Sequence, residues 1–269
     1  MKLARKAVLS GNALKLIAIA AMTVDHLTWV IFPGYQTNVG ILLLHSIGRL
    51  TAPIMCFFIA EGYYYTHDRK RYAARLFLFA LISHFAYNFA FGIPFAPFRT
   101  GIFNQTGVMW ALAWGLAALC VLNSVELKQW HKIALMILIC AISFCADWSC
   151  IAVLVIVAFG TNRGDFKKQM GWMMAFVTMY AAVYFFCIDK VYGVLQIMVA
   201  LSIPLLSLYN GERGRWRGMK WFLFLLSLAP CCLWINSDCA ARRRRGACRR
   251  NVRCIARNDE TGIQFELPA

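Results

Sequence analysis

The feature that most constrains this chain is a series of apolar stretches that recurs along most of its length. Crossing a bilayer takes about 20 apolar residues in a helix, and repeated stretches near that length are typical of polytopic membrane proteins. The composition agrees, because 61% of the residues are hydrophobic and 15% are charged, where a soluble protein has about 25% charged residues. We therefore predict an all-α transmembrane bundle of eight or nine spans in a lipid bilayer. The candidate spans are residues 13–32, 41–64, 73–92, 107–123, 132–146, 149–160, 171–188, 192–209 and 220–235.

The net charge of +16 lies mainly in loops and in the C-terminal tail. Basic residues gather before the first span and in every second loop after it, which is the positive-inside pattern of a protein with a cytoplasmic N-terminus. Cations placed in this way set topology and contact anionic lipids, so we expect no nucleic-acid partner. We expect the first span to remain uncleaved, because it is long and contains Asp25 and His26. The basic residues are Lys2, Arg5, Lys6, Arg69, Lys70, Arg71, Arg75, Lys128, Lys132, Arg163, Lys167, Lys168, Arg213, Arg215, Arg217 and Lys220.

The C-terminal residues do not continue this pattern. We predict a transmembrane domain over residues 1–235 and a basic tail, rich in Cys and Arg, over residues 236–269. If the ninth span crosses the membrane, the arginines of this tail lie on the outer side, against the positive-inside rule. Two interpretations stay open: a disordered, lipid-binding tail, or a segment read in a shifted frame.

Asp25 and His26 stand side by side inside the first apolar stretch, LKLIAIAAMTVDHLTWVIF. A charge at membrane depth costs about 3 kcal/mol unless it is paired or faces a polar cavity. Neighbouring helical residues point about 100° apart, so one narrow stripe cannot hide both groups. The pair therefore predicts a functional site inside the bilayer.

Further polar residues interrupt the later spans. The expected topology places six residues in the outer half of the bundle, where they could share a cavity: Asp25, His26, His45, Arg49, His84 and Asp147. Arg49 is the natural counter-charge for Asp25, because a guanidinium binds a carboxylate well, but it could equally bind substrate. Glu61 lies near the cytoplasmic end, and Asn88 lies one turn beyond His84. Simpler roles stay open for His45 and His84 as packing residues, for Glu61 at the surface and for Asp147 as a helix cap.

The stretches LKLIAIAAMTVDHL, SIGRLTAPIMCFFIAEGYYYT and RLFLFALISHFAYNFAFG resemble the TraX family of bacterial membrane proteins. The ADW segment at Asp147 and the GERGR loop are further points of similarity. The resemblance covers roughly residues 12–222. Its most specific part is an ordered set of pairs: Asp25-His26, Gly48-Arg49 and Glu61-Gly62. The last span, KWFLFLLSLAPCCLWIN, departs from the family because it contains no histidine.

This resemblance implies an acetyltransferase of the bacterial inner membrane that uses acetyl-CoA, since the family's named member acetylates the N-terminal amine of pilin subunits. The acceptor would be an amine or a hydroxyl group. His26 would act as the base, Asp25 would orient or charge-balance it, and Arg49 would stabilise the oxyanion. Basic residues after the second span would hold the phosphates of the donor: Arg69, Lys70, Arg71 and Arg75. The cysteine spacing matches no zinc site, so we expect no metal.

Three other functions are compatible with the same residues. A proton-coupled transporter or channel also needs buried acids, histidines and an arginine. A haem protein could use His26, His45 and His84 as ligands. An assembly factor without chemistry would need none of these side chains.

Overall fold

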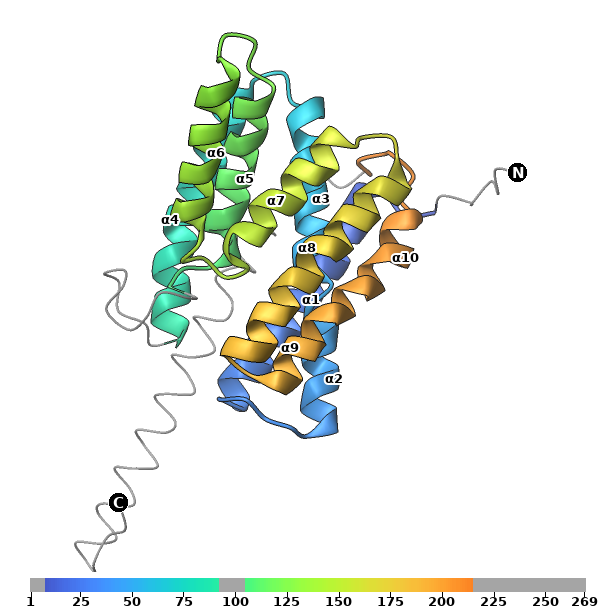
Figure 1. Cartoon of the computed structure of the whole chain (residues 1–269). Helices are drawn as coiled ribbons and strands as arrows, with labels where there is room; N and C mark the ends of the chain where they lie inside the picture. The colour runs from blue at the N-terminus through green and yellow to red at the C-terminus, as the bar shows by residue number, and fades with distance from the viewer. Residues whose placement is uncertain (1–7, 92–104, 215–269) are drawn as a thin grey trace, which may run out of the picture.

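The described residues, 8–91 and 105–214 of the computed structural model, are helical throughout, with short connections and no β-strand. Figure 1 shows the helices gathered into one bundle. The helices are α1 (Gly11–Ile31), α2 (Val39–Gly48), α3 (Thr51–Tyr65), α4 (Arg69–Phe91), α5 (Val108–Leu122), α6 (Gln129–Ser143), α7 (Ser149–Thr161), α8 (Phe166–Cys187), α9 (Lys190–Gln196), the 3₁₀ helix η1 (Ile197–Leu201) and α10 (Ser202–Ser207).

The helical prediction is confirmed for eight of the nine candidate spans, while the ninth, 220–235, and the tail 236–269 lie outside the described residues. Three apolar helices are shorter than a bilayer crossing requires: α5, α6 and α7. The number of crossings and the cytoplasmic N-terminus stay predictions. Four described stretches are long and apolar enough to cross a membrane: Gly11–Ile31, Val39–Tyr65, Phe166–Cys187 and Lys190–Ser207.

Two of the expected spans are interrupted. The span expected over 41–64 divides into α2 and α3, with the break at Arg49 and Leu50. Pro53 explains the break, because in a continuous helix its ring would clash with the carbonyl of Arg49, whereas in the first turn of α3 its missing N–H costs nothing. The span expected over 192–209 changes to a 3₁₀ helix after Gln196 and returns to an α-helix before Pro204.

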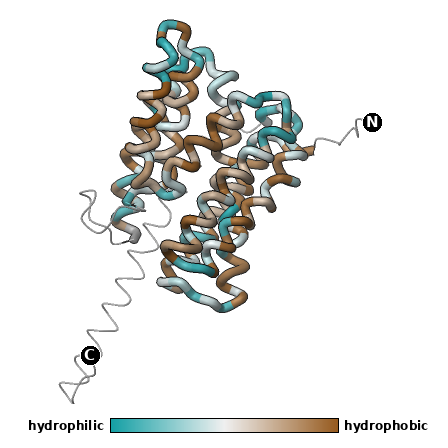
Figure 2. The backbone as a smooth tube through the Cα atoms, in the orientation of Figure 1, coloured by the Kyte–Doolittle hydropathy of each residue, from teal (hydrophilic) through white to brown (hydrophobic). Residues whose placement is uncertain are grey.

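Basic residues gather at one end of the bundle, as the loop pattern predicted. In Figure 1 this end is at the top and carries the α3–α4, α5–α6 and α7–α8 connections, and the α1–α2 and α8–α9 connections lie at the opposite end. Figure 2 shows polar residues concentrated in these connections and apolar residues along the helices. We call the top the basic end. Its cations include Arg69, Lys70, Arg71, Arg163, Lys167, Lys168 and Arg213.

The GERG segment of the chain closes onto the start of α1. The backbone N–H of Gly11 donates to the carbonyl of Glu212 at 2.8 Å, and that of Asn12 donates to the carbonyl of Arg213 at 3.0 Å. Gly214 has a φ of +87°, and a Cβ there would lie 2.7 Å from Ser10 Oγ. A side chain at Gly214 would therefore disrupt a contact that supplies acceptors to the first N–H groups of α1.

The α7–α8 connection is fixed to α3 by Arg163. Its Nε donates to Glu61 Oε1 at 3.0 Å, and its guanidinium lies 4.7 Å from the ring centroid of Tyr64. Asp165 then caps α8 by accepting the backbone N–H of Lys168 at 3.1 Å. This hydrogen bond lowers the pKa of the Asp165 carboxyl, because it stabilises the charged form.

Glycines allow the closest helix contacts. A Cβ at Gly115 of α5 would lie 2.3 Å from Ile156 Cδ1 of α7. At Gly193 of α9 a Cβ would lie 2.7 Å from the backbone N and Cα of Phe185 in α8. Backbone atoms cannot move aside as a flexible side chain can, so the α8–α9 hairpin depends on Gly193.

We expect Gly193→Ala to destabilise the protein by about 1–3 kcal/mol, the usual cost of overpacking. Gly171→Ala is the matched control, since a Cβ there meets no atom within 4 Å and Ala favours helix over Gly by up to about 1 kcal/mol. Thermal unfolding of both variants in one detergent gives the comparison. Equal melting temperatures for the two variants would contradict the close α8–α9 contact.

Candidate functional site

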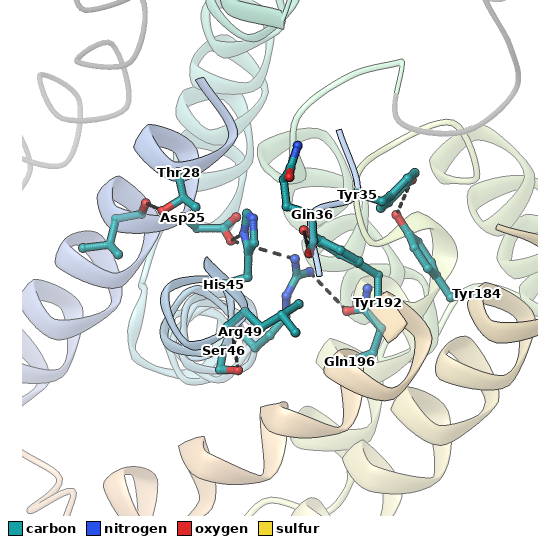
Figure 3. A network of polar contacts seen from close by, with 12 residues as sticks. Asp25, Thr28, Tyr35, Gln36, His45, Ser46, Arg49, Tyr184, Tyr192 and Gln196 are labelled. Atoms are coloured by element: carbon teal, nitrogen blue, oxygen red, sulfur yellow. Dashed lines mark hydrogen bonds and ion pairs between the residues drawn. The ribbon is translucent and has the colours of Figure 1, made fainter. Parts of the chain in front are cut away.

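Asp25 of α1 forms its shortest hydrogen bond with His45 of α2. The distance from Asp25 Oδ1 to His45 Nδ1 is 2.8 Å, and the His45 side chain is completely buried. Figure 3 shows the two side chains pointing toward each other across the helix pair. Asp25 is thereby paired with a residue of the neighbouring helix α2.

Arg49 is the second partner of Asp25, as predicted from charge. Its Nη2 lies 3.9 Å from Asp25 Oδ1, and its Nη1 donates to Gln196 Oε1 at 3.1 Å. Gln196 is buried and is the last residue of α9, so Arg49 joins three helical segments. The Arg49 Nε is also buried and finds no hydrogen-bond acceptor among residues 8–91 and 105–214.

Gly48 makes the approach of α1 to α2 possible. A Cβ at this position would lie 2.4 Å from Asp25 Cβ and 2.6 Å from Asp25 Oδ1. Any other residue would push Asp25 away from His45 and Arg49. Gly48 therefore leaves room for the Asp25 carboxylate, and the next residue, Arg49, supplies its counter-charge.

A small cavity lies beside this charge cluster, with room of about 40 Å³ for a water-sized molecule. It brings together four residues that the sequence proposed for one site: Asp25, His26, Arg49 and Asp147. That volume is enough for water but far too small for acetyl-CoA. A role of these four residues in catalysis stays a prediction. The remaining lining residues are Met22, Gly48, Thr51, Ala52, Val108 and Trp148.

Asp147 reaches the cavity from the tight turn between α6 and α7. Trp148 and Ser149 have φ values of +68° and +46°, a left-handed conformation that costs about 1–3 kcal/mol for a residue other than glycine. The turn is held by the backbone N–H of Asp147, which donates to the carbonyl of Thr106 at 2.8 Å. The interpretation of Asp147 as a helix cap is wrong, because Trp148 occupies the N-cap position of α7 and no side chain caps it. Asp147 instead interacts electrostatically with Arg49 and His26.

Aromatic rings pack around His45. The centroid of Trp29 lies 4.7 Å and that of Tyr192 5.5 Å from the His45 ring. Tyr35 packs against Tyr192 at 4.9 Å and places its hydroxyl 3.3 Å from that of Tyr184.

The sequence analysis did not predict several of these residues as part of the site. Gln196 had a usable signal, because it is a lone amide within an apolar stretch. Tyr35, Tyr184 and Tyr192 had none, since aromatic residues are frequent throughout the chain and their meeting depends on how α8 and α9 fold back on the α1–α2 connection.

Other residues that the sequence predicted to line the site are not part of the cavity's lining. Glu61 pairs with Arg163 at the basic end. It lies ten positions after the cavity residue Thr51 in α3, about 15 Å along the helix axis. His84 and Asn88 contact each other on α4, with 3.5 Å between His84 Nε2 and Asn88 Nδ2. His45 stands behind Asp25 and does not line the cavity.

The basic residues proposed to hold the donor lie in the first two turns of α4. Arg69 stacks on Tyr63 at 4.4 Å, and Arg71 Nε pairs with Asp68 Oδ2 at 3.0 Å on the surface. Arg75 donates from Nε to the carbonyl of Arg71 at 3.2 Å. His67, Asp68, Arg69 and Lys70 line an open groove. A role of this groove in binding acetyl-CoA stays a prediction.

The fold and the site define a class: a helical protein with several candidate membrane spans and a compact cluster of acid, imidazole and guanidinium groups inside the bundle. Comparison with known families then gives the identity. The family model described as TraX protein matches residues 10–233. The chain belongs to the TraX family.

One curated relative and the solved structures complete the comparison. The chain is 29% identical over 231 residues to a probable fimbrial assembly protein FimC, serogroup H1, of Dichelobacter nodosus. The match covers 80% of this chain and 90% of the relative. No solved structure matches the chain.

We expect Arg49→Leu to destabilise the protein by about 3 kcal/mol, because it leaves Asp25 without its guanidinium. In the Arg49→Leu background, Asp25→Asn should cost at least about 1 kcal/mol less than it does alone, because the two charges are coupled. Free energies of unfolding of the four proteins in one detergent complete the cycle. Additive costs would show that the two side chains do not stabilise each other.

Proposed function

We propose that the chain is an integral membrane acetyltransferase that moves an acetyl group from acetyl-CoA to an amine or hydroxyl acceptor. The observation that carries the proposal is the cavity shared by His26, Arg49 and two carboxylates. It combines an imidazole that can move a proton with a guanidinium whose Nε–H has no acceptor among the described residues. Acyl transfer needs both groups close to one carbonyl carbon.

The reaction assigns a separate task to each group. The acceptor nitrogen or oxygen attacks the thioester carbonyl carbon while an imidazole nitrogen of His26 removes its proton. Arg49 stabilises the negative charge that develops on the carbonyl oxygen. The C–S bond then breaks, and the proton held by His26 passes to the departing sulfur, so that CoA leaves as a thiol and the enzyme returns to its starting state.

Asp25 acts on Arg49 rather than on the substrate in this mechanism. Its Oδ1 binds His45 and lies 3.9 Å from Arg49 Nη2, so it keeps the guanidinium charge compensated while substrate is absent. Asp147 interacts with both Arg49 and His26 and is placed to stabilise a protonated imidazole. His45 is a positioning residue, because it holds Asp25 from outside the cavity.

The acceptor we propose is the amine of a surface-filament subunit. Two observations support this choice: membership of the TraX family, in which the resemblance implied acetylation of a pilin N-terminus, and the likeness to a protein named for fimbrial assembly. The inner membrane of a bacterium is the corresponding location. The donor would approach from the basic end and the acceptor from the opposite end.

We expect membranes containing the protein to transfer label from acetyl-CoA carrying a labelled acetyl group. His26→Ala should reduce the rate by at least about 100-fold, the usual contribution of a general base. His84→Ala is the matched control, since this histidine lies on α4 and is not among the residues that line the cavity. The rate of label incorporation, normalised to the amount of protein in the membrane, gives the measurement.

Equal rates for wild type and His26→Ala would contradict the assigned base. Absence of labelled acceptor with wild-type protein, in membranes that contain filament subunits, would contradict the acetyltransferase itself. Solute flux into vesicles without acetyl-CoA would then favour the transporter.

A further inference from the structure

A second cationic feature lies at the basic end, beside the start of α1. Lys15 is in the second turn of this helix, and its ammonium nitrogen lies 4.7 Å from the ring centroid of Phe58. The side chain is half-buried. Burial of an ammonium group without a carboxylate is unfavourable unless another group compensates its charge.

The chain brings a second cation to Lys15 instead of an acid. The hydrogen bonds from Gly11 and Asn12 to the carbonyls of Glu212 and Arg213 hold the GERG segment against the first turn of α1. Arg213 interacts electrostatically with Lys15, and this interaction is repulsive. Neither Lys15 nor Arg213 forms an ion pair within the part of the chain that the structure describes. Two cations held together in this way are arranged to receive an anion.

The position of Lys15 on α1 relates it to the cavity. Met22 and His26, which line the cavity, follow Lys15 by seven and eleven residues. At about 100° per residue Met22 and His26 each lie within about 20° of Lys15, one on either side, so the three side chains share one face of the helix. At about 1.5 Å per residue Lys15 lies about 16.5 Å closer to the basic end than His26. The basic groove at Arg69 belongs to α4, whose main packing partner is α5 rather than α1.

We propose that Lys15 and Arg213 bind a phosphate group at the basic end of the bundle. The phosphate comes either from the CoA part of the acetyl donor or from a phospholipid headgroup, since the same two cations suit both. The shared face with His26 favours the donor, and that assignment rests on the proposed function. The site would hold the charged end of acetyl-CoA while its pantetheine arm extends toward the cavity.

The first arm of the test measures binding without catalysis. Adenosine 3′,5′-bisphosphate, which contains the phosphate-bearing nucleoside part of CoA, is titrated into the purified full chain in detergent, and the thermal shift gives its Kd. We expect Lys15→Gln to weaken binding by about tenfold, the effect of losing one charge-assisted hydrogen bond. Lys15→Arg should bind as wild type does. Lys128→Gln, a change at an exposed lysine of the α5–α6 connection at the same end of the bundle, is the matched control and should leave the Kd unchanged.

The second arm tests phospholipid as the source of phosphate. Melting temperatures are compared in nanodiscs of phosphatidylglycerol and of phosphatidylcholine. A higher value in phosphatidylglycerol that disappears in Lys15→Gln, with no effect of the nucleotide, assigns the site to a lipid headgroup. If Lys15→Gln changes neither the nucleotide Kd nor the lipid dependence, the phosphate site is refuted.

A third measurement separates this inference from the proposed function. Acetyl-CoA is compared with acetyl-pantetheine, which lacks phosphate, as donor. For a donor site, Lys15→Gln should raise KM about tenfold for acetyl-CoA and leave KM for acetyl-pantetheine unchanged. Equal KM values for wild type and Lys15→Gln with acetyl-CoA would refute the donor assignment while the acetyltransferase stands. If the wild-type protein transfers no acetyl group, the acetyltransferase proposal is refuted. The nucleotide titration and the nanodisc comparison then still test whether Lys15 and Arg213 bind phosphate.

Discussion

The contact between Asp25 and the α2–α3 segment is the constraint on which the rest of the site depends. A carboxylate inside an apolar bundle has to be paired, and here His45 lies at 2.8 Å and Arg49 at 3.9 Å from the same oxygen. That pairing requires Gly48, because a Cβ there would overlap Asp25. It also requires the helix to be interrupted after α2, since the break lets Arg49 reach both Asp25 and Gln196. The charge of Asp25 thus accounts for three features: the glycine at position 48, the break between α2 and α3, and the buried amide of Gln196 at the end of α9.

Three interruptions of helical structure converge on this region, although they lie far apart in the sequence. Arg49 stands at the break between α2 and α3, Trp148 in the turn before α7, and Gln196 at the change from α9 to the 3₁₀ helix. Irregular backbone at membrane depth is tolerated only where it is buried in protein or lines a polar cavity. In the α6–α7 turn the hydrogen bond from Asp147 N–H to the Thr106 carbonyl meets this requirement. Broken helices therefore deliver polar side chains to the cavity, which continuous apolar helices would keep out.

Much of this arrangement could be predicted from the sequence, and the rest could not for physical reasons. The apolar stretches marked the helices, and the cost of a lone charge in lipid predicted that Asp25 needs Arg49. The role of His45 was not predictable, because helical spacing alone cannot say whether its ring faces Asp25 or the core. Glu61 was placed near the correct end, but its partner Arg163 lies 102 residues away and depends on how α7 packs against α3. The close contact of α8 with α9 at Gly193 was likewise invisible, since glycine is frequent in the chain.

The small size of the cavity bears on the chemistry that the site can support. Acetyl transfer to an amine competes with hydrolysis of the thioester, so a transferase benefits when water is excluded from its reacting groups. The cavity at Asp25 and His26 has room of about 40 Å³, enough for water but not for a cofactor. In the proposed reaction the phosphate-bearing end of the donor would therefore bind elsewhere, and its acetyl end would approach His26. A basic surface at one end of the bundle would hold the charged end of the donor. The charge cluster inside the bundle would receive its reactive acetyl end.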